Sequence, residues 1–471
     1  MTKQIFLGAF EEFTPNFISN AWSHPRSDTE GFATLPYWQN MARELEAGGF
    51  DFLFLAEALG YPMQPDGAVP EVVIREAVQV PVHDPMALIS GLAATVDRLG
   101  FVVTASTTAQ QPNLNARTFA TLDHLSQGRI AWNVVTSDNQ VALSKLLGQT
   151  NVTPHAERYR RATEFLELSL KLWEGAWEDD AVVHDKATRT FADPSKVHRI
   201  THHGDFFDLD GYFTAIPSPQ RTPLLLQAGT SPAGRAFAGR FGECIFIQDR
   251  DLDVVKANVA DLRARAVENG RDGGDIKVID AVAIVVGSTE EEARRLREEL
   301  DRTPSRESAA ALFMGWSGVD LMSFPLNATL ADVSTEVGKS TLGTFQMGDE
   351  SPTIAEILDR ITSSIGGIRV TGTPESVADQ LQHIVDYTDI DGFLIEYTYG
   401  GMATYRDFID HVVPLLRDRW MLPDEPRTGS MRRRILGHDS DRLPDNHPGA
   451  VYRTTHGADP VAPPTEKAVL S

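Results

Sequence analysis

Short apolar runs alternate with longer amphipathic segments along most of the chain. Runs of β-branched and aromatic residues predict strands, and segments with apolar positions three or four apart predict the helices between them. The predicted strands are Ile5–Ala9, Phe52–Ala56, Phe101–Val103, Ile130–Val135, Leu224–Ala228, Cys244–Ile247, Lys277–Val286 and Gly392–Tyr397. The predicted helices are Tyr37–Ala47, Pro85–Val96, Arg117–Leu125, Arg158–Trp173, Ser231–Arg240, Asp253–Glu268 and Pro374–Tyr387. This alternation, with about eight strands, predicts an α/β protein built as a closed (β/α)8 TIM barrel.

Three segments do not fit this repeat. Residues 177–212 are rich in Asp, His and aromatic residues, and residues 302–367 mix AAALFMGW with Ser, Thr and Gly stretches. Both are expected to be long insertions, of the kind that often forms lids. Residues 421–471 are rich in Pro, Arg, His and Asp, which predicts an extended C-terminal arm that lies on a neighbouring subunit or is partly disordered. We therefore expect one barrel domain, residues 1–420, followed by this arm.

Charge and cysteine content narrow the class of protein. The formal net charge of −23 argues against nucleic acid or an anionic membrane as a partner, because both need a concentrated positive surface. The first residues, MTKQIFLGAFEEF, contain neither a signal-peptide core nor a run of about 18 apolar residues. Cys244 is the single cysteine, so no intrachain disulfide can form. These features favour a cytoplasmic enzyme.

Polar side chains follow two neighbouring predicted strands. Thr104, Ser106 and Thr107 come directly after the strand that begins at Phe101, and Asn133, Thr136 and Ser137 lie around the end of the next strand. In a parallel barrel the carboxyl ends of the strands meet at one rim, where the active sites of this architecture lie. We therefore expect ligand contacts at these positions.

The sequence LLLQAGTSPAGR, residues 224–235, predicts an anion site. An apolar strand ends in Ala228-Gly229-Thr230-Ser231, and Ser231 can cap the following helix with Pro232 in its first turn. Free backbone amides and glycines at a helix start favour phosphate binding. The alternative is a simple helix cap.

The sequence HAERY gives a second candidate for the same anion. His155 and Tyr159 are four residues apart, so on a helix they share a face, with Arg158 adjacent. They could reach one phosphate. In the alternative, His155 caps the helix and Tyr159 packs in the core.

Other motifs are absent or weak. GxGxxG, GxxxxGK[ST], HExxH and GxSxG do not occur, which argues against a Rossmann site for NAD(P)H, a P-loop, a metalloprotease and an esterase. His202, His203 and Asp205 lack the spacing of metal ligands, so we expect no metal site.

Several segments, in order, resemble one known family. They are FATLDHLSQGRIAWNVVTS, HAERYRRATEFLELSLKLWEGAWEDDAVVHDK, FADPSKVH, HHGDFF, PSPQRTPLLLQAGTSPAGRAFA and DGFLIEY. Over residues 5 to about 419 the chain is similar to the nitrilotriacetate, dibenzothiophene-sulfone and long-chain-alkane monooxygenase group of the bacterial-luciferase-like flavin enzymes. IREAVQVPVHDP and RLPDNHPGAVYR also match segments of this group.

The resemblance implies a luciferase-like barrel that receives reduced FMN from a separate flavin reductase and uses O2, through a flavin C4a-(hydro)peroxide, to oxygenate its substrate. It also implies a homodimer or homotetramer. The isoalloxazine would contact Glu57, Ser106, Thr107, Asn133, Thr136 and Ser137, and the phosphate would lie on His155, Tyr159, Ser231 and the backbone near Gly229 and Thr230. Most relatives have Asp where this chain has Glu57.

The resemblance also indicates where the substrate pocket differs. Where members of the group carry Cys, His and Tyr, this chain has Thr14, Phe17 and a position near Met63. Two further histidines become Asp138 and Leu312, while Gln79 is retained. The candidate walls are Phe10, Phe13, Phe17, Met63, Leu312, Phe313, Met314 and Trp316. They favour an apolar substrate, either an alkane or an aromatic compound with or without a halogen or sulfur atom, as in xenobiotic degradation. In the alternative, some of these side chains only fill the core.

The flavin would itself be the oxidant, so no dedicated nucleophile is expected. Thr14, Gln79 and Asp138 are the polar candidates that would position substrate or peroxide. Two other functions stay open: a deazaflavin- or flavin-dependent dehydrogenase or reductase on the same barrel, and a non-catalytic flavin-binding protein.

Overall fold

The barrel predicted from the sequence is present. The computed structural model describes residues 3–15, 21–229, 231–329, 351–363 and 367–458. Eight parallel strands form a closed ring in the order β1, β2, β3, β4, β9, β10, β11 and β13, and β13 pairs back onto β1. The ring consists of β1 (Phe6–Glu12), β2 (Phe52–Ala56), β3 (Gly100–Ser106), β4 (Ile130–Val135), β9 (Leu224–Gln227), β10 (Cys244–Ile247), β11 (Lys277–Val286) and β13 (Gly392–Ile395).

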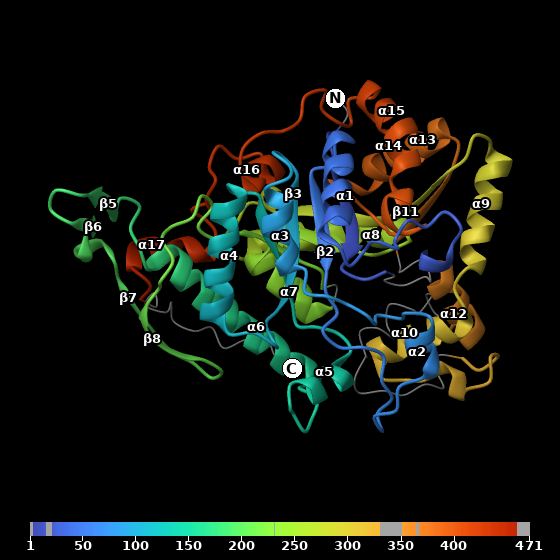
Figure 1. Cartoon of the computed structure of the whole chain (residues 1–471), viewed down its shortest axis with the longest axis horizontal. Helices are drawn as coiled ribbons and strands as arrows, with labels where there is room; N and C mark the ends of the chain where they lie inside the picture. Colours follow the sequence, from blue (N-terminus) through green and yellow to red (C-terminus); the bar gives the residue numbers. More distant parts are fainter. Residues whose placement is uncertain (1–2, 16–20, 230, 330–350, 364–366, 459–471) are drawn as a thin grey trace.

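Helices cover the outside of this ring. Figure 1 shows α1, α3 and α4 side by side in front of the strands. The helices are α1 (Leu35–Ala47), α2 (Glu71–Arg75), α3 (Met86–Ala93), α4 (Pro112–Ser126), α5 (Gln140–Leu146), α6 (His155–Leu170), α7 (Pro232–Phe241), α8 (Leu252–Glu268), α9 (Glu290–Arg302), α10 (Arg306–Ser317), α12 (Ile354–Ser363), α13 (Pro374–Thr388), α14 (Arg406–His411), α15 (Val413–Asp418), α16 (Met431–Leu436) and α17 (Tyr452–Thr455). No helix in the described part of the chain is long and apolar enough to cross a membrane.

Aromatic side chains fill the barrel interior below its carboxyl rim. Phe10 stacks on Phe54 with ring centroids 5.4 Å apart, and Phe246 lies 6.0 Å and 5.8 Å from these two rings. Residues alternate between the two faces of a strand, so one inward position on each of β1, β2 and β10 supplies these rings. They form an apolar floor beneath the rim.

Both predicted insertions have regular structure. Residues 177–212 contain two antiparallel hairpins, β5 (Val182–Asp185) with β6 (Thr190–Ala192) and β7 (Arg199–His203) with β8 (Asp208–Tyr212). Figure 1 shows the first of them projecting from the barrel. Residues 302–367 contain α10 and α12, which bury Leu312, Phe313, Ile357 and Leu358 together with residues of α2.

A ninth strand extends the barrel sheet where the sequence did not predict one. The first half of β11 pairs with β10 and β13, and its second half, Val282–Val286, pairs with β12 (Ile368–Gly372). The insertion therefore returns to the barrel through a strand that is attached to β11 outside the closed ring.

The described part of the C-terminal segment packs on its own barrel. Residues 421–458 contain α16 and α17, and residues 459–471 lie outside the described chain. Contact of this segment with a neighbouring subunit stays a prediction. Met431, Ile435 and Leu436 of α16 lie in one apolar cluster with Phe6 and Phe52 at the amino end of the barrel. Arg432 and Arg453 of this segment pair with the buried carboxylates of Glu243 and Glu174, which are distant in the sequence and which local composition does not indicate.

Candidate active site at the barrel rim

A cavity of about 290 Å³ opens at the carboxyl ends of the barrel strands. Its floor includes three aromatic residues, Phe10, Phe54 and Phe246, and its walls come from β2, β4 and β9 and from α6 and α7. The predicted site residues that line it are Phe10, Glu57, Asn133, Thr136, Ser137, Asp138, Tyr159, Gly229 and Trp316. The rim and the helix starts, predicted separately as ligand sites, are thus parts of one cavity.

The predicted polar residues after β3 and β4 are tied to one another. The Ser137 hydroxyl donates to the Ser106 hydroxyl at 2.6 Å, and the Thr107 hydroxyl donates to the carbonyl of Val135 at 3.1 Å. Ser106 and Thr107 do not line the cavity themselves but hold the segment that does.

One amide at the rim is left half-satisfied. The Asn133 amide nitrogen donates to the Thr104 hydroxyl at 2.9 Å, but Asn133 Oδ1 is buried without a partner among the described residues. A buried acceptor without a donor costs about 1–3 kcal/mol. A ligand with an N–H group would satisfy it.

Polar side chains pack directly on the glycine that precedes α7. A Cβ atom on Gly229 would lie 2.2 Å from Gln227 Nε2 and 2.6 Å from the Tyr159 hydroxyl. Ser231 caps α7 by accepting from the amide of Gly234 at 3.1 Å, as predicted, whereas Thr230 lies outside the described residues. Glycine at position 229 therefore lets these two polar groups approach the backbone between α6 and α7.

The start of α6 supplies a buried positive charge. Arg158 is 6% exposed, and its Nε and Nη1 atoms have no partner within the described chain. The His155 ring lies 5.0 Å from the Tyr159 ring, and burial, with Arg158 nearby, lowers the pKa of His155. Near neutral pH the positive charge at this end of the cavity is therefore carried by Arg158. The sequence analysis noted this arginine only as adjacent to His155 and Tyr159, and the structure adds that two of its nitrogens have no partner among the described residues.

Two carboxyl groups on the cavity wall titrate near neutral pH. Burial raises the pKa of Glu57 to about 7, helped by the charge of Asp84. Burial also raises the pKa of Asp138 to about 6, against the opposing effect of Arg158. These groups can hold or release protons at the pH at which most enzymes work.

Two further buried carboxyls were not predicted. Glu12 Oε1 accepts from the amide of Ala58 at 2.9 Å, Oε2 has no described partner, and burial raises the pKa of Glu12 well above its ordinary value. Burial raises the pKa of Glu396 to about 7, and Glu396 accepts from Gln248, a cavity residue, at 3.4 Å. Glu12 lies three residues beyond the predicted strand Ile5–Ala9, and Glu396 lies within the predicted strand Gly392–Tyr397. Only the closed barrel shows that both face its rim.

The polar residues predicted to position the substrate are dispersed. Asp138 lines the cavity, whereas the Thr14 hydroxyl donates to the carbonyl of Pro81 at 2.7 Å, and Gln79 Oε1 accepts from Asn139 at 2.9 Å. Thr14 and Gln79 are buried behind the cavity wall. Their part in positioning substrate stays a prediction.

Only some of the residues predicted to form the apolar walls line the cavity. Phe10 and Trp316 line the cavity. Phe13 instead packs on Trp38 and His83 with ring centroids 5.4 Å and 5.0 Å away. Leu312 and Phe313 lie in the apolar cluster formed by α2, α10 and α12, Met63 and Met314 are buried, and Phe17 lies outside the described residues. Two of the predicted wall residues therefore line the cavity. For the other six, a place in the substrate pocket stays a prediction.

The raised pKa of Glu57 predicts a stability that depends on pH. The pKa of Glu57 is about 7 in the folded chain, against 4.5 for an ordinary glutamate. The contribution of the protonated Glu57 to folding stability is therefore fully present below pH 4.5 and is lost as the pH rises through 7. In the flavin-free protein Glu57→Gln is expected to leave the melting temperature at low pH unchanged and to add about 1–2 kcal/mol of stability at pH 8. Thermal unfolding at both pH values measures this. Glu268→Gln, an exposed glutamate on α8, is the control, and an equal gain at both pH values would contradict the assignment.

Comparisons with known proteins identify the family of this chain. The model of the luciferase-like monooxygenase family matches residues 13–391. The chain belongs to this family. It is 38% identical to the dimethyl-sulfide monooxygenase of Hyphomicrobium sulfonivorans over 99% of its own length and 97% of that protein. It is 39% identical to the long-chain alkane monooxygenase of Geobacillus thermodenitrificans over 96% and 99%.

A solved structure shows the same fold. A riboflavin lyase, crystallised with modified FMN and riboflavin, superposes with a TM-score of 0.91 at 38% identity, over 96% of this chain and all of that one. The family and these relatives support an oxidoreductase of the monooxygenase type on a luciferase-like barrel.

Proposed function

We propose that the protein is the oxygenase component of a two-component system, which takes reduced FMN from a separate flavin reductase and uses O2 to oxygenate an uncharged, mainly apolar compound. The observation that carries this proposal is the cavity itself, which has an aromatic floor and the close-packed Gly229 in its wall, in a chain of the monooxygenase family. The buried Arg158 precedes the lining residue Tyr159 and is not itself among the lining residues.

The residues present fit the two ends of FMN. The phosphate would lie against Arg158, Tyr159 and the start of α7 at Gly229 and Ser231, where positive charge, a phenol and a helix amino end converge. The ring would lie over the aromatic floor, where Asn133 Oδ1 needs a donor. Glu57, Ser106, Thr107, Thr136, Ser137 and His155 complete the proposed cofactor set.

Reduced FMN supplies two electrons, so that substrate, O2 and FMNH2 give oxygenated product, FMN and water. The chain's part is to bind, orient and exclude water. Phe10, Phe54, Phe246 and Trp316 keep the cavity apolar, which limits access of water to the reacting atoms. The carboxyls of Glu57 and Asp138 hold protons at the wall and can exchange them with the bound ring or the product.

The substrate is proposed to carry no charge. No lysine or arginine is among the described residues that line the cavity, so a carboxylate-bearing substrate would have no counter-charge there. The names of the relatives supply a test panel of dimethyl sulfide, a long-chain alkane, dibenzothiophene sulfone and riboflavin. A cytoplasmic homo-oligomer is the proposed state.

The test is turnover with a flavin reductase, NADH and FMN, using isotopically labelled O2 and this panel. We expect labelled oxygen in one product, and no product when reductase, FMN or O2 is left out. A product formed without O2 from a reduced deazaflavin would instead support the dehydrogenase alternative. Tight FMN binding with no product from any member of the panel would support a flavin-binding protein and overturn the proposal.

A further inference from the structure

A second cluster of chemistry-bearing side chains lies away from the cavity. The ligand atoms of Glu178, His198 and His456 all lie within 4.8 Å of one another, and none of these residues lines the cavity. Figure 1 places α17, which His456 follows, beside β7 on the side of the molecule from which the β5–β6 hairpin projects. The cluster therefore joins the C-terminal segment to the 177–212 insertion.

Backbone pairing fixes two of the three side chains. Trp177 and Val197 form an antiparallel bridge, with the amide of Glu178 donating to the carbonyl of Lys196 at 3.0 Å and the amide of His198 donating to that of Ala176 at 2.7 Å. Glu178 and His198 thus point to the same face, since side chains alternate along extended segments. His198 Nε2 lies 2.9 Å from Glu178 Oε1, so this half of the cluster is already assembled.

The third side chain is held by an unusual backbone conformation. His456 ends α17 with φ 49° and ψ 45°, the left-handed region that favours glycine. Its ring stacks on that of His198 with centroids 4.0 Å apart and an angle of 28° between the planes. The next residue, Gly457, is packed so closely that a Cβ atom on Gly175 would lie 2.4 Å from its nitrogen.

We propose that Glu178, His198 and His456 bind one divalent transition-metal ion with the chemistry of Zn²⁺, which fastens the C-terminal segment to the insertion. Two imidazoles and one carboxylate, with a water in the fourth position, are a ligand set that Zn²⁺ accepts, whereas Ca²⁺ and Mg²⁺ prefer oxygen ligands alone. Metal bonds of about 2.0–2.2 Å require the ligand atoms to approach more closely than 4.8 Å. Rotation of the exposed His456 side chain supplies this approach.

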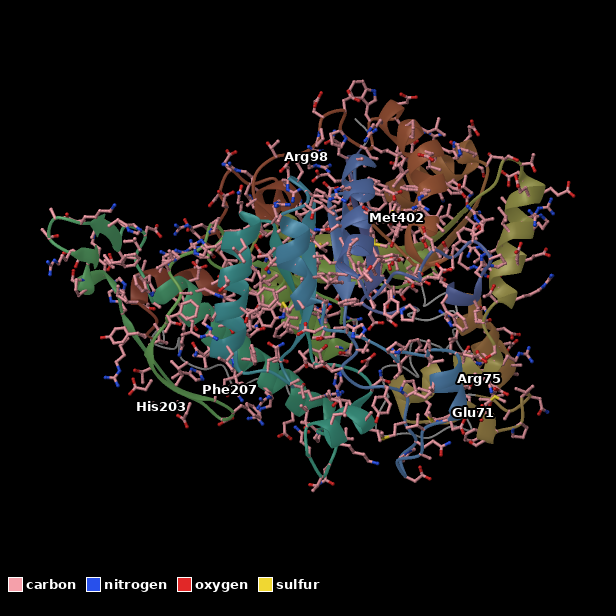
Figure 2. The ribbon with its side chains drawn as sticks, viewed as in Figure 1. Glu71, Arg75, Arg98, His203, Phe207 and Met402 are labelled. Carbon is pink, nitrogen blue, oxygen red and sulfur yellow. The ribbon has the colours of Figure 1, made fainter. Side chains whose placement is uncertain are left out.

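The histidines that the sequence first suggested have other partners. His202 lies 3.1 Å from Lys171 Nζ and 3.3 Å from Glu164 Oε1, and His203 lies 2.7 Å from Asp208 Oδ1. The proposed ligands come from three separate segments, which is why no spacing motif shows them. His203, labelled in Figure 2, lies at the end of β7 in the β7–β8 hairpin and serves as a matched control.

The experiment uses the untagged full-length protein, treated with a chelator and dialysed. Titration with Zn²⁺ alone, followed by calorimetry, is expected to show one ion bound per chain and a raised melting temperature. His198→Ala and His456→Ala should each weaken Zn²⁺ binding by at least about tenfold, and Glu178→Gln should weaken it in the same direction. His203→Ala should bind as the unchanged protein does. Bound Co²⁺ should give a visible absorption band that His456→Ala abolishes.

The outcome is independent of the proposed oxygenase function, because the cluster shares no residue with the cavity. Circular dichroism and affinity for reduced FMN show whether each variant is folded. Absence of saturable Zn²⁺ binding in the micromolar range, or binding that survives in folded His198→Ala and His456→Ala proteins, overturns the proposal.

Discussion

Replacing Arg432 with methionine is expected to lower the free energy of unfolding by about 3–5 kcal/mol. Arg432 is fully buried in the C-terminal segment, where Nε and Nη2 donate to the two carboxylate oxygens of Glu243 at 2.7 Å and 2.8 Å. Nη1 also donates to the carbonyl of Thr222 at 2.9 Å. The substitution would leave the carboxylate of Glu243, itself fully buried, without its counter-charge.

Chemical denaturation followed by circular dichroism measures this loss. Arg433→Met changes the adjacent, exposed arginine of α16 and is expected to cost less than about 0.5 kcal/mol. The double substitution Arg432→Met, Glu243→Gln removes both charges and is expected to recover part of the stability. If Arg432→Met unfolded at the same denaturant concentration as the unchanged protein, residues 421–458 would not be docked on their own barrel in solution.

The barrel strands were predictable because they are continuous apolar runs. Phe52–Ala56, Ile130–Val135, Cys244–Ile247 and Lys277–Val286 agree with the structure to the residue. Strands buried between a barrel interior and a layer of helices have no polar face, so their ends coincide with the end of the apolar run. The rim followed from the same pattern, since the residues after β3 and β4 change abruptly to hydroxyl and amide side chains.

What could not be predicted depends on partners distant in the sequence. β12 is a short run, IRVTG, that is a strand because the second half of β11 is available to pair with it. The segment MRRRIL has the composition of a solvent-exposed tail, yet Glu243 and the carbonyls before β9 make Arg432 a core residue. The composition of a segment indicates whether it is soluble when exposed. It does not indicate whether buried groups elsewhere in the fold can pair with its charged residues.

The same limit applied to the site. His155 and Tyr159 were recognisable by their helical spacing, and Gly229 and Ser231 by their place at a helix start. The unpartnered nitrogens of Arg158 and the buried carboxyls of Glu12 and Glu396 become apparent only when the rim is closed. A buried polar group without a partner lowers the stability of the folded chain, and a bound ligand can supply the missing partner. Such groups therefore indicate a ligand site more directly than the residue types alone.

Arg158→Met is therefore expected to weaken the binding of reduced FMN by about a hundredfold, or roughly 2.7 kcal/mol, on the scale of charge-assisted hydrogen bonds to a phosphate. Anaerobic titration measures the dissociation constant. Arg160→Met is the matched control, because Arg160 lies on the same helix but its side chain is 61% exposed and paired with Asp205. Stability of the flavin-free protein should not fall, since the substitution removes a buried charge that has only partial compensation.

A comparison of the affinities for FMN and riboflavin separates the contribution of the phosphate from that of the ring. Riboflavin carries the same isoalloxazine without the phosphate, so Arg158→Met should leave the affinity for reduced riboflavin almost unchanged while that for reduced FMN falls. An equal loss for both flavins would mean that Arg158 supports the ring or the fold, and no loss for either would place the phosphate elsewhere. The difference between the two flavins therefore tests whether the buried charge at the start of α6 is the counter-ion of the cofactor, which is the physical basis for placing FMN in this cavity.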